Sequence, residues 1–408
     1  CRRDQGLSVA FYVPFRTGRN IVPQLLDVDG MTITRREFIA GVGSITLLAS
    51  PVFNARAAGL QKRNLVIIML RGGMDGLTAV PPRDKRLNSA RPDILVKKTK
   101  KLTSDFDLHP RLETFHELWQ AGQAGVVHAT NIPYTNRSHF EGQNLMESGG
   151  HVPYGESTGW LGRGLEAAEL GGLAISLPMP LLLRGNTVQD NFFPTHMALP
   201  YRPELITIAG SYPQGSEVSK AMEKVIARPK SMMRKSGSND AADLADTAAT
   251  ELARADGPRV AVFDLDGFDT HAAQGGDDGE HGERLSDYDE IIKRLRDGLG
   301  DAFDNTLILT LTEFGRKLDQ NGGYGTEHGY GTAVMMAGGL VRKRIYADWP
   351  GLKTKELFDG QDLNATIDAR AVYCSAMVAC FDVDFGYMRK HAFWDEPLPD
   401  LTDALFKV

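Results

Sequence analysis

Five carboxylate and imidazole side chains, four after short apolar runs and one in a following glycine-rich loop, could bind one ligand together. They are Asp75, Asp269, His271, Glu313 and His328. The apolar runs have the character of buried parallel strands, and ligands of open α/β sheets bind at the carboxyl ends of such strands. Zinc and manganese accept mixed nitrogen and oxygen ligands, whereas carboxylates alone would favour magnesium or calcium. We therefore expect a divalent metal, Zn or Mn first and Mg or Ca second.

Each of these residues also has a purely structural explanation. Asp75 stands between glycines and could cap a turn, and residues 269–271 could cap a helix. A buried Glu313 must be paired or metal-bound, and Arg316 could be its partner. His328 lies in a glycine-rich loop and could be solvated. The metal hypothesis depends on the five residues occurring together.

Ser138 is the candidate nucleophile, because it precedes a helix predicted over residues 141–147. A helix N-terminus stabilises anions such as an alkoxide or a bound phosphate. The alternative is that Ser138 only caps this helix, with Glu141 completing a capping box. The neighbouring His139 could be a ligand, a base or a packed side chain.

An anionic substrate would need cationic groups near the nucleophile. Three arginines could bind it, namely Arg137, Arg163 and Arg316, and we assign Arg316 a catalytic role.

The elements that must position these side chains alternate between strand and helix patterns. Strands are predicted at residues 64–70, 125–129, 259–265, 306–311 and 332–337, all taken as parallel. Helices are predicted around residues 112–121 and over 285–303. This alternation indicates an α/β fold with a mostly parallel central sheet.

Residues 215–256 differ from the rest, being rich in Ala, Lys, Ser and Asp. We interpret them as an exposed helical excursion with a flexible loop rather than as a second domain. The sequence thus predicts a single domain over residues 58–408.

The first 57 residues have the pattern of a targeting segment rather than of a folded domain. From Met31 the chain has paired Arg35 and Arg36, a mildly apolar run of residues 39–49, and a small-x-small site at residues 55–57. This order predicts a twin-arginine signal peptide over residues 31–57, with a short buried helix as the alternative. We expect residues 1–30 to be an upstream artefact. The predicted location is periplasmic or extracellular, and the translocation machinery is a predicted partner.

Composition and charge narrow the classes of function. The chain has 408 residues and a net charge of −6, and residues 1–57 hold seven basic and four acidic residues, so the remainder carries −9. Such a protein is a poor candidate for nonspecific nucleic-acid binding. No apolar stretch after residue 57 reaches the roughly 20 residues of a membrane span. Cys374 and Cys380 are predicted to be buried thiols, with a disulfide as the alternative.

Several segments resemble twin-arginine-exported proteins of the "domain of unknown function 1501" family, within the alkaline phosphatase and sulfatase superfamily. They occur in order along the chain: LRGGMDGLTAVPP (70–82), LHPRLETFHELWQAGQAGVVHA (108–129), RSHFEGQNLMESG (137–149), TGWLGRGL (158–165), GFDTHAAQ (267–274), TLTEFGRKLDQNGGYGTEHGYG (310–331) and YADWPGL (346–352). The resemblance implies a three-layer α/β/α sandwich, alkaline phosphatase-like, with a two-metal site.

The resemblance also implies roles by position. Asp75 corresponds to the first-strand ligand, Asp269 and His271 to an Asp-and-His pair, and His328 to the last histidine ligand. Glu313 stands where the superfamily has an Asp-His pair, with Phe314 replacing the histidine. Ser138 falls at the nucleophile position.

Two hypotheses of function follow. The first is a metal-dependent hydrolase of phosphate or sulfate esters. The second is a cell-envelope binding or assembly protein that keeps the fold without hydrolysis, motivated by Phe314 at a ligand position. A nicotinamide-linked oxidoreductase is disfavoured, because residues 71–76 do not form a Gly-x-Gly-x-x-Gly motif.

Overall fold

The computed structural model describes residues 62–170, 179–186, 213–216, 241–255 and 257–408, together with the backbone of three strands at residues 44–49, 173–174 and 190–191. All of these belong to one compact unit, Val42–Val408. The paired arginines and the cleavage site of the predicted signal peptide lie outside the described residues, as do residues 217–240.

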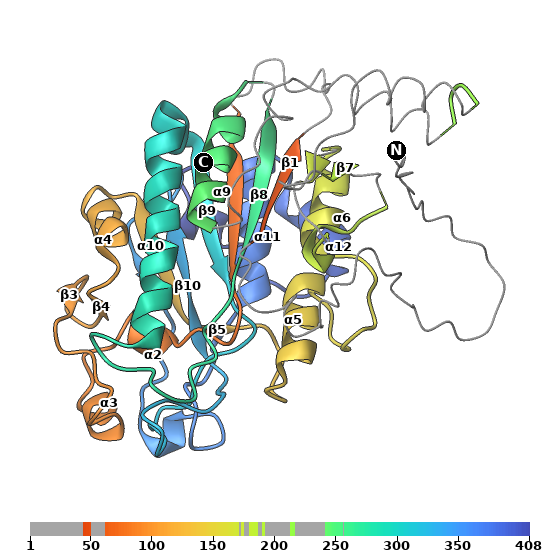
Figure 1. The fold of residues 1–408 in the computed structure, drawn as a ribbon. Helices are drawn as coiled ribbons and strands as arrows, with labels where there is room; N and C mark the ends of the chain where they lie inside the picture. Colours follow the sequence, from red (N-terminus) through yellow and green to blue (C-terminus); the bar gives the residue numbers. More distant parts are fainter. Residues whose placement is uncertain are drawn as a thin grey trace, which may run out of the picture. The chain divides into compact units, whose positions relative to one another are not determined.

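A central sheet of eight strands organises this unit (Figure 1). The order is β1-β8-β2-β9-β10-β5-β11, with β12 also pairing with β5. The bounds are β1 Ser44–Ala49, β2 Asn64–Leu70, β5 Ala124–Asn131, β8 Pro258–Leu265, β9 Thr306–Leu311, β10 Thr332–Ala337, β11 Ile345–Tyr346 and β12 Ile367–Asp368. Parallel pairs join β8, β2 and β9, and join β5 to β11 and β12. The predicted α/β class with a mostly parallel sheet is therefore confirmed.

Strand β10 corrects one expectation, because it runs antiparallel to both of its neighbours, β9 and β5. A parallel strand would need a crossover of a dozen or more residues, usually a helix, to return the chain to the opposite edge of the sheet. Residues 312–331 contain no helix, so β10 starts at the edge where β9 ends. This connection keeps the glycine-rich loop at the carboxyl edge of the sheet.

Helices cover both faces of the sheet, and the alternation of side chains along the strands separates two cores. Leu65, Ile67 and Met69 of β2 enter one core, and the residues between them enter the other. One face packs against α4 (Glu113–Gln120), α9 (Ala241–Ala253) and α10 (Glu280–Leu299). The other face packs against α5 (His139–Ser148), α6 (Trp160–Ala167), α11 (Ala369–Phe381) and α12 (Phe385–Phe393) (Figure 1).

Helix α9 is a helical part of the segment 215–256, and it is not exposed as expected. Its apolar residues Leu244, Ala245, Ala248, Ala249 and Leu252 are buried in the core that α10 shares. Small side chains allow the close approach: a Cβ on Gly298 of α10 would lie 2.7 Å from that of Ala249. Most of the alanines of the segment belong to this tightly packed helix, whereas its lysines fall in residues 217–240, outside the described residues.

Strand β1 lies within the predicted signal peptide, and its backbone pairs antiparallel with β8 at the edge of the sheet. The sequence predicts a folded domain that begins at residue 58, after this strand. An apolar run can serve either as a signal or as an edge strand, because both need only local hydrophobicity. The pairing with β8 places Ser44–Ala49 in the sheet, although they precede the predicted domain.

Shorter elements complete the chain. They are α2 Gly76–Ala79, α3 Lys85–Ala90, β3 Lys100–Lys101, β4 Asp107–Leu108, β6 Leu173–Ala174, β7 Asp190–Asn191, α13 Thr402–Leu405 and the 3₁₀ turns Leu181–Leu183, Gly300–Asn305 and Thr354–Glu356. Cys374 and Cys380 are free and buried in α11, as expected. Among the described residues, no helix combines the length and apolar character that crossing a membrane requires.

Candidate metal centre

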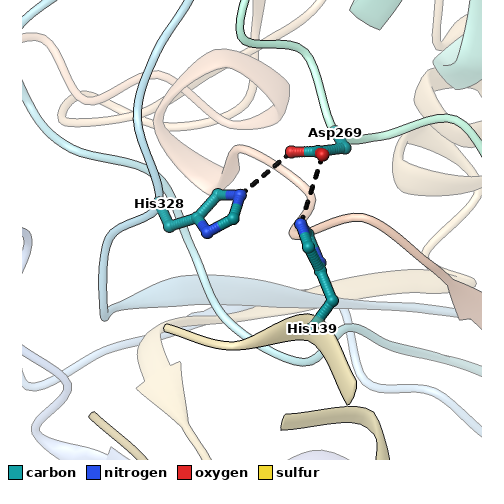
Figure 2. Close-up of side chains that lie close together, drawn as sticks. All are labelled: His139, Asp269 and His328. Carbon is teal, nitrogen blue, oxygen red and sulfur yellow. Dashed lines mark hydrogen bonds and ion pairs between the residues drawn. The ribbon is translucent and has the colours of Figure 1, made fainter. Parts of the chain in front are cut away.

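Three side chains from separate loops and helices meet at the carboxyl edge of the sheet (Figure 2). His139 opens α5, Asp269 follows β8, and His328 lies in the loop that leads to β10. One ligand atom from each lies within 4.8 Å of the others. This His-Asp-His group could hold a metal ion.

Asp269 is the centre of the group. Its carboxylate oxygens lie 3.3 Å from His139 Nε2 and 3.0 Å from His328 Nε2. Arg316 Nη2 donates to the same carboxylate at 2.7 Å. Burial raises the pKa of Asp269, but the contacts with His139, His328 and Arg316 outweigh it and hold the pKa well below its usual range. Asp269 is therefore an anion at neutral pH.

The far nitrogens of both histidines are occupied by acceptors. His139 Nδ1 lies 2.9 Å from Glu313 Oε1, and His328 Nδ1 lies 2.9 Å from the carbonyl oxygen of Arg137. These acceptors assign the proton of each ring to Nδ1, so the Nε2 atoms face the Asp269 carboxylate. Metal-ligating histidines typically bond a carboxylate or a carbonyl through their other nitrogen.

The protonation of His139 depends on whether a cation is present. Burial lowers its pKa, but the contacts with Asp269 and Glu313 raise it to about 9. Its Nε2 atom is buried and has no hydrogen-bond partner among the described residues. A bound metal would displace a proton from this atom.

His271 extends the group to a fourth potential ligand. Its Nε2 atom lies 2.9 Å from His328 Nε2 and 3.1 Å from Asp269 Oδ1, while its Nδ1 lies 3.0 Å from Glu327 Oε2. Two ligand nitrogens on one tetrahedral zinc would be about 3.3 Å apart, given metal–nitrogen bonds of about 2.0–2.1 Å. The 2.9 Å between the Nε2 atoms of His271 and His328 is close to that value.

Glu313 lies behind His139 rather than in the group of ligand atoms. Its Oε1 accepts hydrogen bonds from Gly72 N and Gln143 Nε2, each at 2.9 Å, besides its contact with His139. Burial raises the pKa of Glu313, but the hydrogen bonds from His139 and Gln143 lower it by more than burial raises it. The net shift of the pKa is therefore downward. Glu313 is thus placed to orient His139. Its expected partner Arg316 pairs with Asp269 instead.

Asp75 is, besides Glu313, the second predicted ligand that the structure does not bring into this group. It caps α2 and pairs with the buried Arg91, and it accepts from Thr78 Oγ1 at 2.8 Å and Gln274 Nε2 at 2.7 Å. Burial raises its pKa, but Arg91 and His281 lower it to about 2. Asp75 links α2 and α3 to the loop that carries Asp269 and His271.

Ser138 occupies the N-cap position of α5, but its side chain makes no capping hydrogen bond. Glu141 does not complete a capping box, because its carboxylate accepts from the hydroxyl of Tyr134 at 2.8 Å. The half-buried Ser138 therefore stands next to His139 without a capping role.

The three arginines expected to bind an anion are engaged elsewhere. Arg316 is buried and donates to the carbonyls of Gly72, Gly73, Phe268 and Thr326 besides Asp269. Arg137 pairs with Asp362, and Arg163 donates to the carbonyls of Ser148, Thr158 and Ala392. Arg316 holds together the loops around the site.

His139 is the residue of the group that the strand-end pattern missed. It lies beyond the end of β5, separated from Asn131 by a loop, so it does not directly follow an apolar run. Phe314, at the position where a ligand was expected, packs under the rings of His139 and His328 at 4.8 and 4.7 Å between centroids. Phe314 thus supports the two histidine rings by packing.

Comparison with solved structures gives distant likenesses, among them the following two. A crystal structure of Ps i-CgsB in complex with k-i-k-neocarrahexaose is 13% identical and has a TM-score of 0.40, with 84% of this chain and 76% of that chain covered. The structure of the PH0037 protein from Pyrococcus horikoshii is 14% identical with a TM-score of 0.28, covering 70% of this chain and 88% of that one. No curated protein matches the chain.

A family comparison is more informative. The match covers residues 121–373, which include all four potential ligands and the residues that bond their far nitrogens. The chain belongs to the family described as "Protein of unknown function (DUF1501)".

Proposed function

We propose that this protein is a metal-dependent hydrolase of phosphate or sulfate esters, with its centre at His139, Asp269, His271 and His328. The observation that carries the proposal is the direction of the imidazoles. Each Nδ1 atom contacts an acceptor, and each Nε2 atom lies within 3.3 Å of the Asp269 carboxylate. A structural ion pair would need only one such histidine.

The residues fit a zinc or manganese ion in donor type. Three nitrogens and a carboxylate are a mixed set of the kind that these metals accept. The buried Nε2 of His139 lies 3.3 Å from the Asp269 carboxylate and makes no other close polar contact among the described residues, which suits an atom that would bind a metal. When bound, such a cation polarises an ester oxygen and lowers the pKa of an attached hydroxyl or water.

The chain's own groups would orient this chemistry. Glu313, Glu327 and the Arg137 carbonyl hold the three rings, and Arg316 holds Asp269. The side chains of Asp269 and His271 are 45% and 39% exposed, which leaves one side of the centre open to a substrate. We assign Ser138 as the nucleophile, because it adjoins His139 and its side chain makes no capping bond.

The resemblance to the alkaline phosphatase and sulfatase superfamily supports the substrate class and an alkaline phosphatase-like, three-layer fold. It also supports export by the twin-arginine machinery to the periplasm or beyond. That route carries folded proteins, so the metal could be loaded before export.

One observation favours a second candidate, a non-catalytic binding protein of the cell envelope. The guanidinium groups of Arg137, Arg163 and Arg316 are already engaged by a carboxylate or carbonyls. An ester hydrolase would use such groups to bind the non-transferred oxygens. In this alternative, the protein binds the metal but does not hydrolyse an ester.

Metal content and turnover should be measured on the same preparation. Protein stripped with a chelator and reloaded with Zn²⁺ or Mn²⁺ is expected to bind at least one ion per chain. It should then hydrolyse an aryl phosphate or an aryl sulfate. His271→Ala should lose at least about 100-fold in metal affinity or turnover, because ligand loss exceeds the effect of changing an outer partner.

The matched control is His391→Ala on α12, whose ring bonds only the carbonyl of Tyr387 within its own helix. It should leave both readouts unchanged. Tight metal binding without turnover of any ester would favour the binding protein. If the wild-type protein binds no metal, the proposed centre is wrong and both candidates lose their basis.

A further inference from the structure

A basic hollow lies at the opposite edge of the sheet from the metal centre. It has a volume of about 560 Å³ and is lined by Gly122, Arg342, Lys343, Arg344, Ile345 and Lys407. β10 runs from Thr332, which pairs with the end of β5, to Ala337, which pairs with its start. A strand of this length spans about 20 Å, so the hollow and the metal centre are well separated.

The cations of the hollow are held in place by backbone carbonyls. Arg342 Nε donates to Phe406 O at 2.7 Å, and Arg344 Nη1 donates to Ala404 O at 3.0 Å. Lys407 Nζ donates to Gly122 O at 2.8 Å. The described residues accept no further hydrogen bond from the Arg342 and Arg344 guanidinium groups, whereas Lys407 Nζ also donates to Gly339 O at 3.2 Å. The positions of these cations are therefore fixed before any ligand arrives, which reduces the entropy cost of binding.

The positive charge of the hollow is not neutralised by its own lining, which contains no acidic residue among those described. Burial and the neighbouring Arg342 lower the pKa of Lys407, although Asp304 acts in the opposite direction. Asp304 itself accepts from Gln123 Nε2 at 3.0 Å. Cations that repel one another in a shared hollow would gain stability from a bound anion.

We propose that this hollow binds a multiply charged oxyanion, a phosphate or sulfate group. Guanidinium groups match the geometry of such anions through paired N–H donors, and the chain offers two of them with a lysine between. The oxyanion could be free in solution or be carried as a lipid headgroup. This site is independent of the metal centre.

Binding of pyrophosphate and inorganic phosphate should be measured by calorimetry on the full chain. The test variant is Arg342→Gln/Arg344→Gln, because glutamine keeps a donor for the carbonyls of residues 404–406 while removing both charges. We expect it to weaken pyrophosphate binding at least about tenfold, since hydrogen bonds to charged groups are the stronger ones. Thermal unfolding should show that the variant remains folded.

The matched control removes two positive charges from another basic segment. Lys97 and Lys98 are exposed and do not line the hollow, and their backbone amides bond Asp277. Lys97→Gln/Lys98→Gln should bind pyrophosphate as the wild type does. An equal loss in the two double variants would mean nonspecific charge attraction and would overturn the proposal.

Two further arms separate the sources and the sites. Sedimentation with phosphatidylcholine vesicles containing phosphatidic acid tests the headgroup. Binding that is limited to these vesicles and lost in the arginine variant would identify a lipid-borne phosphate as the ligand. Pyrophosphate binding should persist in His328→Ala. If it is lost there and unchanged in the arginine variant, the anion binds at the metal centre and the proposal is wrong.

Discussion

At the scale of single residues, the contact of each histidine Nδ1 atom determines whether its Nε2 atom is free of a proton and able to bind a metal. The ring of His328 is fixed by the carbonyl of Arg137, whose backbone has a φ of 61°, in the left-handed region. That conformation costs a non-glycine residue about 1–2 kcal/mol. The buried Asp362 offsets the cost by pairing with the Arg137 side chain through Nε at 3.1 Å and through Nη2. We therefore expect Asp362 to position His328 through Arg137 in the proposed metal centre.

Replacing Asp362 with asparagine should weaken metal binding by about 10–100-fold, as changes to outer partners of metal ligands do. The variant retains the side-chain shape but loses the charge that holds Arg137. Metal affinity measured by competition with a chelator checks the prediction. Nitrogen-15 spectra of the histidines should show His328 losing its preference for the Nδ1 proton.

Asp359→Asn is the control, because Asp359 faces the same guanidinium at 3.9 Å but is 63% exposed. It should leave metal affinity unchanged. Equal affinities for wild type and Asp362→Asn, with metal still bound, would remove Asp362 from the mechanism without touching the metal centre.

Some of the predicted site residues could be grouped from the sequence, and others could not because their partners come from other segments. Asp269, His271 and His328 could be grouped from the sequence, because strand ends meet at one edge of a sheet. Asp75 obeys the same rule yet pairs with Arg91, which comes from a helix further along the chain. No sequence pattern indicates that the carboxylate of Asp75 will pair with the guanidinium of Arg91. Arg316 is similar, because its carbonyl partners come from three separate segments.

At the scale of elements, the apolar runs located the strands but not the direction of β10. Residues 332–337 have the composition of a buried parallel strand, and they are buried on both faces. The direction depends on the preceding loop, which has no crossover helix. The same limit explains α9, whose alanine-rich face gives no sign of its partner until α10 and its Gly298 are placed.

The packing of α9 can be tested by enlarging one buried side chain. Ala249→Leu should lower the free energy of unfolding by about 1–3 kcal/mol, because extra methylenes in a filled core force neighbours to move. Ala249 is fully buried, and a Cβ on Gly298 would lie 2.7 Å from it. Urea unfolding measures the change. Thr250→Leu, at an exposed position of the same helix, should be close to neutral. An unchanged free energy of unfolding in Ala249→Leu would mean that α9 is not tightly packed against the core.

At the scale of the whole molecule, the sheet separates the two proposed sites, one for a cation and one for an anion. Its carboxyl edge carries the residues that could hold a metal, and its amino edge carries the basic hollow. The edge strand β1 belongs to residues that would be removed if the predicted signal peptide is cleaved at residue 57. Cleavage would then expose the edge of β8, so the sheet of the exported protein would differ from that of the full chain.

Stability of the whole fold should fall in mild acid because of His128. Its Nε2–H donates to Val80 O at 2.9 Å, and its Nδ1 accepts from Ala129 N at 2.8 Å, so the buried ring fits only when neutral. Burial lowers the pKa of His128 to about 4. The unfolded chain, with a pKa of about 6.5, takes up a proton first as the pH falls. The stabilising contribution is therefore complete above about pH 6.5 and is lost as the pH falls towards 4.

One group with this shift contributes up to about 3 kcal/mol over that window, at about 1.4 kcal/mol for each unit of pKa. Burial lowers the pKa of His281 to about 3 and acts in the same direction, so the wild-type slope should be steep. Urea unfolding of wild type and His128→Gln at pH 7.0, 6.0, 5.0 and 4.5 tests the assignment. The substitution has its own cost, which is read at pH 7.0. The difference between the two proteins should then shrink at each lower pH, because glutamine takes up no proton. A constant difference from pH 7.0 to 4.5 would mean that the neutral state of His128 does not set the acid limit of the fold.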